Sequence, residues 1–134
     1  MQGRTITLLD YRRLMNLMNA PTSTISTAVA ARLTYELNCA RIQAPEDIHH
    51  KVVTMNSTVM LRDRVNGDEL EVTVTYPNSV DVRTKRISVF SPTGIALLGR
   101  RVGTIIGWNT PAGLRQFEIV DLLYQPEAVG DYSQ

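Results

Sequence analysis

The sequence predicts an α+β fold in which a helical N-terminal part, residues 1–44, precedes a strand-rich C-terminal part, residues 45–134. Apolar residues recur at helical spacing in the first part and alternate with polar residues in the second. The charge changes as well. Residues 1–44 carry five arginines against two acidic residues, a net +3, and the rest carry nine basic against eleven acidic residues, a net −2. We therefore expect a domain boundary near Ala44 and Pro45.

Two helices are expected in the first part, over residues 10–19 and over residues 23–42. Each carries an apolar stripe: Tyr11, Leu14, Leu17 and Met18 in the first, and Ile25, Val29, Leu33, Leu37 and Ala40 in the second. Asp10 is the expected N-cap of the first helix, and Pro45 is expected to stop the second. At about 1.5 Å per residue, the helices would be roughly 15 and 28 Å long.

The segment between these helices breaks helical structure. It contains Asn19, Ala20, Pro21, Thr22 and Ser23, and Pro21 lacks the amide hydrogen that a helix needs. A short connection favours antiparallel packing, so we expect a helical hairpin with these five residues at its tip.

The second part is predicted to form five strands and one short helix. The expected strands are residues 52–62, 69–76, 87–90, 103–109 and 115–125, with the helix at 92–98 and an extended or loosely ordered tail at 126–134. Asn66 and Gly67 predict a hairpin turn after the first strand, because both residues tolerate positive φ. This order predicts a mostly antiparallel sheet that curves over one helix.

Several functional classes find no support in the sequence. The single cysteine, Cys39, excludes an intramolecular disulfide and fits a reducing cytoplasm, and no apolar run approaches the roughly 18 residues of a membrane-spanning helix. Cys39, His49 and His50 lack the spacing of a metal site, and no phosphate-binding glycine loop or nucleophile elbow occurs. A net charge of +1 argues against direct nucleic-acid binding. We expect a cytoplasmic protein with no enzyme activity, metal, cofactor or membrane contact.

Residues 91–99 form a candidate protein-docking element. Pro92 occupies the expected first position of the short helix. Ile95, Leu97 and Leu98 follow in a stretch that we expect to be too short to bury all three. A rigid, partly apolar turn on a surface is typical of a docking element.

Residues 52–126 resemble the C-terminal domain of the Gre-type transcript cleavage factors, the GreA/GreB family. The resemblance is carried by residues 87–99 (Ile-Ser-Val-Phe-Ser-Pro-Thr-Gly-Ile-Ala-Leu-Leu-Gly), Val102, Gly103, residues 110–113 (Thr-Pro-Ala-Gly), Glu118 and Ile119. Residues 52–57 and residues 124–132 are similar to one short member of this family in particular.

The resemblance implies an FKBP-like C-terminal domain behind an N-terminal antiparallel coiled coil. It also implies a partner, bacterial RNA polymerase, which such proteins contact at the rim of its secondary channel. The family's rim contact lies at the start of the short helix. Its counterpart here is Ser91 and Pro92, with Phe90, Thr93 and Leu97 beside them. Because such relatives act singly at one channel, we expect a monomer.

One departure from the family bears on mechanism. Family members that stimulate RNA cleavage carry acidic residues at the coiled-coil tip, and these help to hold a catalytic Mg²⁺, which needs oxygen ligands. Residues 19–24 contain no acid, and the nearest ones, Asp10 and Glu36, are two to three turns away. The expected helices are also far shorter than those of a cleavage factor. We therefore expect a protein that competes with longer factors without stimulating cleavage.

Two other functions stay open. One is peptidyl-prolyl isomerisation, which needs a deep pocket lined by several aromatic side chains, whereas this chain has two Phe, one Trp and five Tyr in total. The other is a module that binds a different protein, such as a kinase or a chaperone, through residues 91–98.

Overall fold

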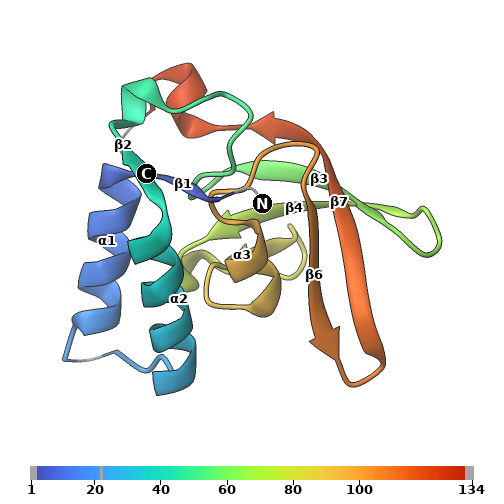
Figure 1. Ribbon diagram of the computed structural model, residues 1–134, viewed down its shortest axis with the longest axis horizontal. Coiled ribbons are helices and arrows are strands. Elements are labelled where there is room, and N and C mark those ends of the chain that lie inside the picture. Colours follow the sequence, from blue (N-terminus) through green and yellow to red (C-terminus); the bar gives the residue numbers. More distant parts are fainter. Residues whose placement is uncertain (1–2, 22, 132–134) are drawn as a thin grey trace.

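The computed structural model describes residues 3–21 and 23–131 (Figure 1). Two helices, α1 (Leu8–Asn19) and α2 (Thr27–Cys39), lie side by side at one end, and a curled five-stranded sheet lies at the other. A third, short helix, α3 (Pro92–Leu97), lies between them. The fold is therefore α+β, as the sequence predicts.

Neither of the two long helices has the N-cap that the sequence predicts. α1 begins at Leu8, because Thr7 Oγ1 accepts a hydrogen bond from the backbone N–H of Asp10 at 3.0 Å. Thr7 is therefore the N-cap, and the prediction that Asp10 caps this helix is wrong. Ser26 caps α2 in the same way, accepting from the N–H of Val29 at 3.2 Å. α2 thus begins later than expected.

A two-stranded parallel sheet closes one end of the helical part. Strand β1 (Thr5–Thr7) pairs with β2 (Arg41–Gln43). This pairing ends α2 at Cys39 instead of near residue 42. Together with the later start at Thr27, this makes α2 about 20 Å long and not 28 Å. Neither strand is predicted from the sequence, because three residues carry too little alternation to indicate a strand.

The main sheet has the strand order β5-β4-β3-β7-β6. Its strands are β3 (Thr58–Asp63), β4 (Glu69–Thr75), β5 (Arg86–Ser88), β6 (Ile105–Thr110) and β7 (Gly113–Tyr124). Neighbours are antiparallel except β4 and β5, which are parallel, so the prediction of a mostly antiparallel sheet is confirmed. The first strand begins at Thr58 and not at residue 52, because Ser57 N–H bonds the Thr54 carbonyl and closes a buried turn before it.

The C-terminal segment is anchored as far as the structure describes it, to residue 131. Residues Pro126–Val129 form a 3₁₀ helix, and the Gln125 side-chain amide donates to the carbonyls of His49 (2.9 Å) and Val52 (2.7 Å). Thr54 Oγ1 donates to Glu127 Oε1 at 2.6 Å. The expectation of a loose or extended tail is therefore wrong over this range, and its last three residues lie outside the described part.

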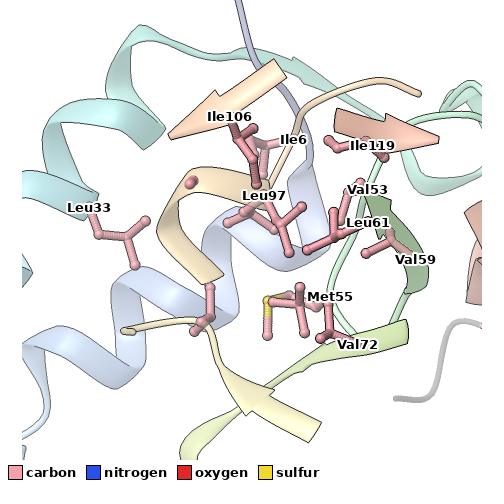
Figure 2. Packing of buried hydrophobic residues seen from close by; sticks show 14 of the residues in the cluster. Ile6, Leu33, Val53, Met55, Val59, Leu61, Val72, Leu97, Ile106 and Ile119 are labelled. Atoms are coloured by element: carbon pink, nitrogen blue, oxygen red, sulfur yellow. The ribbon is translucent and has the colours of Figure 1, made fainter. Parts of the chain in front are cut away.

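Helix α3 lies inside the hydrophobic core (Figure 2). The exposed fraction is 3% for Ile95, 0% for Leu97 and 1% for Leu98. The expectation that this segment leaves apolar side chains on the surface is therefore wrong. The same cluster contains Leu14 of α1 and Leu33 of α2, so the helical part and the sheet bury α3 together. The apolar residues of a six-residue helix can all be buried when elements from both parts of the chain pack around it.

Candidate docking site at the start of α3

The turn that begins α3 is held by the hydroxyl groups of two serines. Ser91 Oγ accepts from the N–H of Gly94 at 3.1 Å and donates to the carbonyl of Ser88 at 2.6 Å. Ser88 Oγ in turn accepts from the N–H of Phe90 at 3.0 Å. Pro92, at the first helical position, fixes its own φ. The start of α3 is therefore a rigid turn.

Gly94 allows α3 to lie against the end of β5. A Cβ atom at this position would be 2.2 Å from the carbonyl oxygen of Ser88 and 2.7 Å from the Cα of Val89. Both are backbone atoms, so the clash could be relieved only by moving the turn away from the strand. Nothing in the local sequence marks Gly94, because only the tertiary structure shows which atoms face it.

The five residues predicted to form the docking site differ in their exposure to solvent. Pro92 is exposed, and Phe90, Ser91 and Thr93 are half-buried. Leu97 is fully buried and packs in the core. Its side chain cannot touch a partner without unfolding α3, so its assignment to the docking surface is corrected. The candidate site is thus residues 90–93.

The C-terminal end of α3 is held by an arginine near the N-terminus of the chain. The Arg4 guanidinium donates to the carbonyls of Ile95 and Leu98, the latter at 2.9 Å, and pairs with Glu36 of α2 at 2.7 Å. A cation at this end of a helix satisfies carbonyls that have no partner within the helix. Arg4 was not predicted as a structural residue, because nothing in the local sequence pairs it with residues more than 90 positions away.

The hairpin tip joins α1 to α2 at the end away from β1 and β2 (Figure 1). Asn19 ends α1 and is exposed, as is Pro21, and the N–H of Ser23 donates to the Ala20 carbonyl at 3.0 Å. Thr22, also assigned to the tip, lies outside the described residues.

The two acids nearest the tip in sequence are engaged elsewhere. Asp10 is 3% exposed, and its carboxylate accepts from the N–H of Met55 at 3.1 Å. Burial raises the pKa of Asp10 to about 6, although the Met55 hydrogen bond opposes this shift. Glu36 is occupied by its ion pair with Arg4. Neither carboxylate is at the tip.

The described residues offer no metal-binding group of three or more His, Cys, Asp and Glu side chains. His49 and His50 stack on each other with ring centroids 4.5 Å apart, and both are exposed. Within the described ranges, no helix is long and apolar enough to cross a membrane.

Comparison with known proteins identifies the class. The family model for the C-terminal part of the GreA/GreB transcription elongation factors matches residues 48–124, and the chain belongs to this family. It is 40% identical over 125 residues to the "Regulator of nucleoside diphosphate kinase" of Escherichia coli (strain K12), covering 92% of this chain and 91% of that protein. These findings confirm the resemblance drawn from residues 52–126.

Two further matches extend this result. The "Transcription inhibitor protein Gfh1" of Thermus thermophilus is 38% identical over 93 residues, which cover 60% of each chain. A solved GreA/GreB-type elongation factor from Nitrosomonas europaea superposes with a TM-score of 0.77 at 37% identity, over 92% of this chain and all of that one. These relatives are regulators and transcription factors rather than enzymes.

Proposed function

We propose that this protein regulates transcription by docking on bacterial RNA polymerase at the rim of the secondary channel. The observation that carries the proposal is the rigid turn at residues 90–93. It presents Pro92 at the position where the family resemblance places the rim contact. A relative named as a transcription inhibitor supports a regulatory role. We further propose that the protein acts as a monomer in the cytoplasm.

The proposal gives the two parts of the chain different roles. Residues 1–44 form a short coiled-coil hairpin that points into the channel, and residues 45–134 form an FKBP-like domain that holds the rim. Contacts between the helices support the hairpin: Tyr11 Oη donates to Asn38 Oδ1 at 2.9 Å, and the Thr34 hydroxyl lies 3.9 Å from Met18 Sδ.

We propose that docking does not stimulate transcript cleavage. Helices α1 and α2 have 12 and 13 residues, so the hairpin extends only about 20 Å. No acidic residue occurs between Asn19 and Ser26, and Asp10 and Glu36 are engaged away from the tip. A divalent cation at the polymerase active site would gain no carboxylate ligand from this tip. The protein then acts by occupying the channel entrance in competition with longer factors.

Binding to purified bacterial RNA polymerase, with GreA as competitor, tests the proposal. We expect saturable binding that GreA displaces and that Ser91→Asp and Pro92→Ala weaken. Aspartate retains an oxygen that can accept from the Gly94 N–H, so Ser91→Asp adds charge at the site and keeps the cap, but it loses the hydrogen bond that Ser91 donates to the Ser88 carbonyl. Pro77→Ala is the matched control, because Pro77 is also an exposed proline at the first position of a short helix.

If no saturable binding to RNA polymerase is seen at micromolar concentrations, the protein has the fold of this family but does not bind its partner. Equal loss in Pro77→Ala and Pro92→Ala would place the contact elsewhere. Cleavage is tested by adding the protein to a stalled transcription elongation complex. We expect no shortening of the transcript, whereas GreA, the positive control, should shorten it.

A second candidate partner comes from the name of the Escherichia coli relative, a regulator of nucleoside diphosphate kinase. No residue of this chain points to direct contact with that kinase, and we propose that any such regulation acts through transcription. Co-purification of the two proteins in the absence of polymerase would favour the alternative, a protein-interaction module using the same turn.

A further inference from the structure

A pocket of about 490 Å³ lies beside the C-terminal end of α3, at the end of the helix opposite the docking turn. Five segments line it: the N-terminal segment, α2, α3, the connection after α3, and β6. Their charged lining residues are Arg4, Arg32, Glu36 and Arg100. No step of the proposed polymerase contact uses this pocket.

The lining of this pocket carries an excess of positive charge. Three arginines face one carboxylate, Glu36, among its lining residues, a formal excess of +2. Glu36 is bonded to Arg4 at 2.7 Å, and Arg4 also donates to two carbonyls of α3, so this guanidinium is fixed in place. Burial lowers the pKa of Arg4, and the positive charges of Arg100 and Arg32 lower it further, although the ion pair with Glu36 opposes this shift. An anion in the pocket would relieve this repulsion.

The shape and chemistry of the pocket select among anions. Guanidinium groups bind phosphate through paired, parallel hydrogen bonds. A phosphate monoester carries a charge of about −1.5 to −2 at pH 7, which matches the excess of +2. The space beside Gly103 in the pocket is empty, since a Cβ atom added to this residue would have no other atom within 4 Å. The volume falls in the range of about 300–1,000 Å³ that is usual for small-molecule sites, and it leaves room for more than one phosphate.

We propose that this pocket binds a small phosphate-bearing molecule, held by the guanidinium groups of Arg32 and Arg100 against the fixed Arg4. The proposal is independent of polymerase binding, because residues 90–93 do not line the pocket. The shared chemistry is the phosphate group, and its source is either a nucleotide or a plain phosphate chain.

The test is a titration of ¹⁵N-labelled protein with inorganic phosphate, tripolyphosphate and ATP at constant ionic strength, followed by amide chemical shifts. We expect saturable shifts at Gly103, Thr104 and Gly107, which line the pocket. Arg32→Gln and Arg100→Gln should each weaken binding by about tenfold or more, the usual effect of removing one charged hydrogen-bond partner. Arg4 is left unchanged in the test, because it also holds α3.

Arg83→Gln is the matched control, because it removes the same charge from a side chain that is 93% exposed and lies outside the pocket. Tighter binding of ATP than of tripolyphosphate would identify a nucleotide, and equal binding a phosphate chain; either result supports the site. Shifts that do not saturate, or binding weakened equally by Arg83→Gln, would overturn it. Tighter binding of an oligo-glutamate peptide than of any phosphate probe would also overturn it.

Discussion

Arg4 and Glu36 form an ion pair that joins the N-terminus of the chain to α2, with 2.7 Å between Nη2 and Oε2 and side chains that are 6% and 24% exposed. The same guanidinium holds the carbonyls of Ile95 and Leu98. One side chain thus ties α2 and the end of α3 together, and it fixes the helix whose other end presents the proposed docking turn.

The first prediction concerns this pair. Glu36→Gln should lower the free energy of unfolding by about 1–3 kcal/mol, because it leaves the buried Arg4 charge without a carboxylate partner. Glu69→Gln breaks the pair with Arg62, in which both side chains are 49% exposed, and should cost less than about 1 kcal/mol. Urea denaturation measures both. Equal effects in the two variants would contradict the structural role of Arg4.

The second prediction concerns Gly94. Gly94→Ala should destabilise the protein by about 1–3 kcal/mol or more, because the new methyl group meets the Ser88 carbonyl and the Val89 Cα. It should also weaken polymerase binding, since relief of the clash displaces residues 90–93. Gly3→Ala is the control: its Cβ meets no atom within 4 Å, and we expect a change within about 0.5 kcal/mol. Thermal unfolding of both variants measures the difference.

The third prediction separates packing from docking along α3. Leu97→Ala should cost about 2–5 kcal/mol of stability, because Leu97 is fully buried in the core. Pro92→Ala, at an exposed position, should change stability far less and lower polymerase affinity instead. Both variants would be compared by denaturation and by binding at a temperature where each is folded. A stable Leu97→Ala protein with lost affinity would restore Leu97 to the contact surface.

The fourth prediction is a pH dependence of stability that originates at Asp10. Its pKa is about 6 in the folded protein against an ordinary value of 3.8. The folded state therefore binds more protons than the unfolded state between about pH 4 and 6, and this contribution to stability is lost as the pH rises through that window. At 1.36 kcal/mol per pKa unit, the loss is about 3 kcal/mol.

Asp10→Asn removes this titration and can still accept from the Met55 N–H. The difference in unfolding free energy between wild type and variant should therefore shift by that amount between pH 4 and 7, in the variant's favour at the higher pH. Parallel stability curves from urea denaturation across this range would show that Asp10 titrates normally.

Much of the fold follows from local sequence patterns. The alternation in β4, the turn at Asn66 and Gly67, and the start of α3 at Pro92 were all predicted, because each depends on neighbouring residues. The start of α3 was predicted because an N1 proline marks a helix start in sequence. The assignment of the docking site to this turn comes from the family resemblance and stays a prediction.

Tertiary structure decided which of these residues are accessible. Leu97 is buried because α1 and α2 cover α3 together with the sheet, and a short apolar segment does not show how many elements surround it. The end of α2 was likewise decided by the pairing of β2 with β1.

The contacts made by Arg4 are the clearest example of a structural feature that no local sequence pattern predicts. They join residues 32, 91 and 94 positions apart, and a hydrogen bond leaves no periodic signal at such separations. Local chemistry therefore determined the elements and the candidate turn. The packing of those elements determined burial, the position of Arg4 and the arginine-lined pocket, because charge and exposure depend on neighbours that only the folded chain brings together.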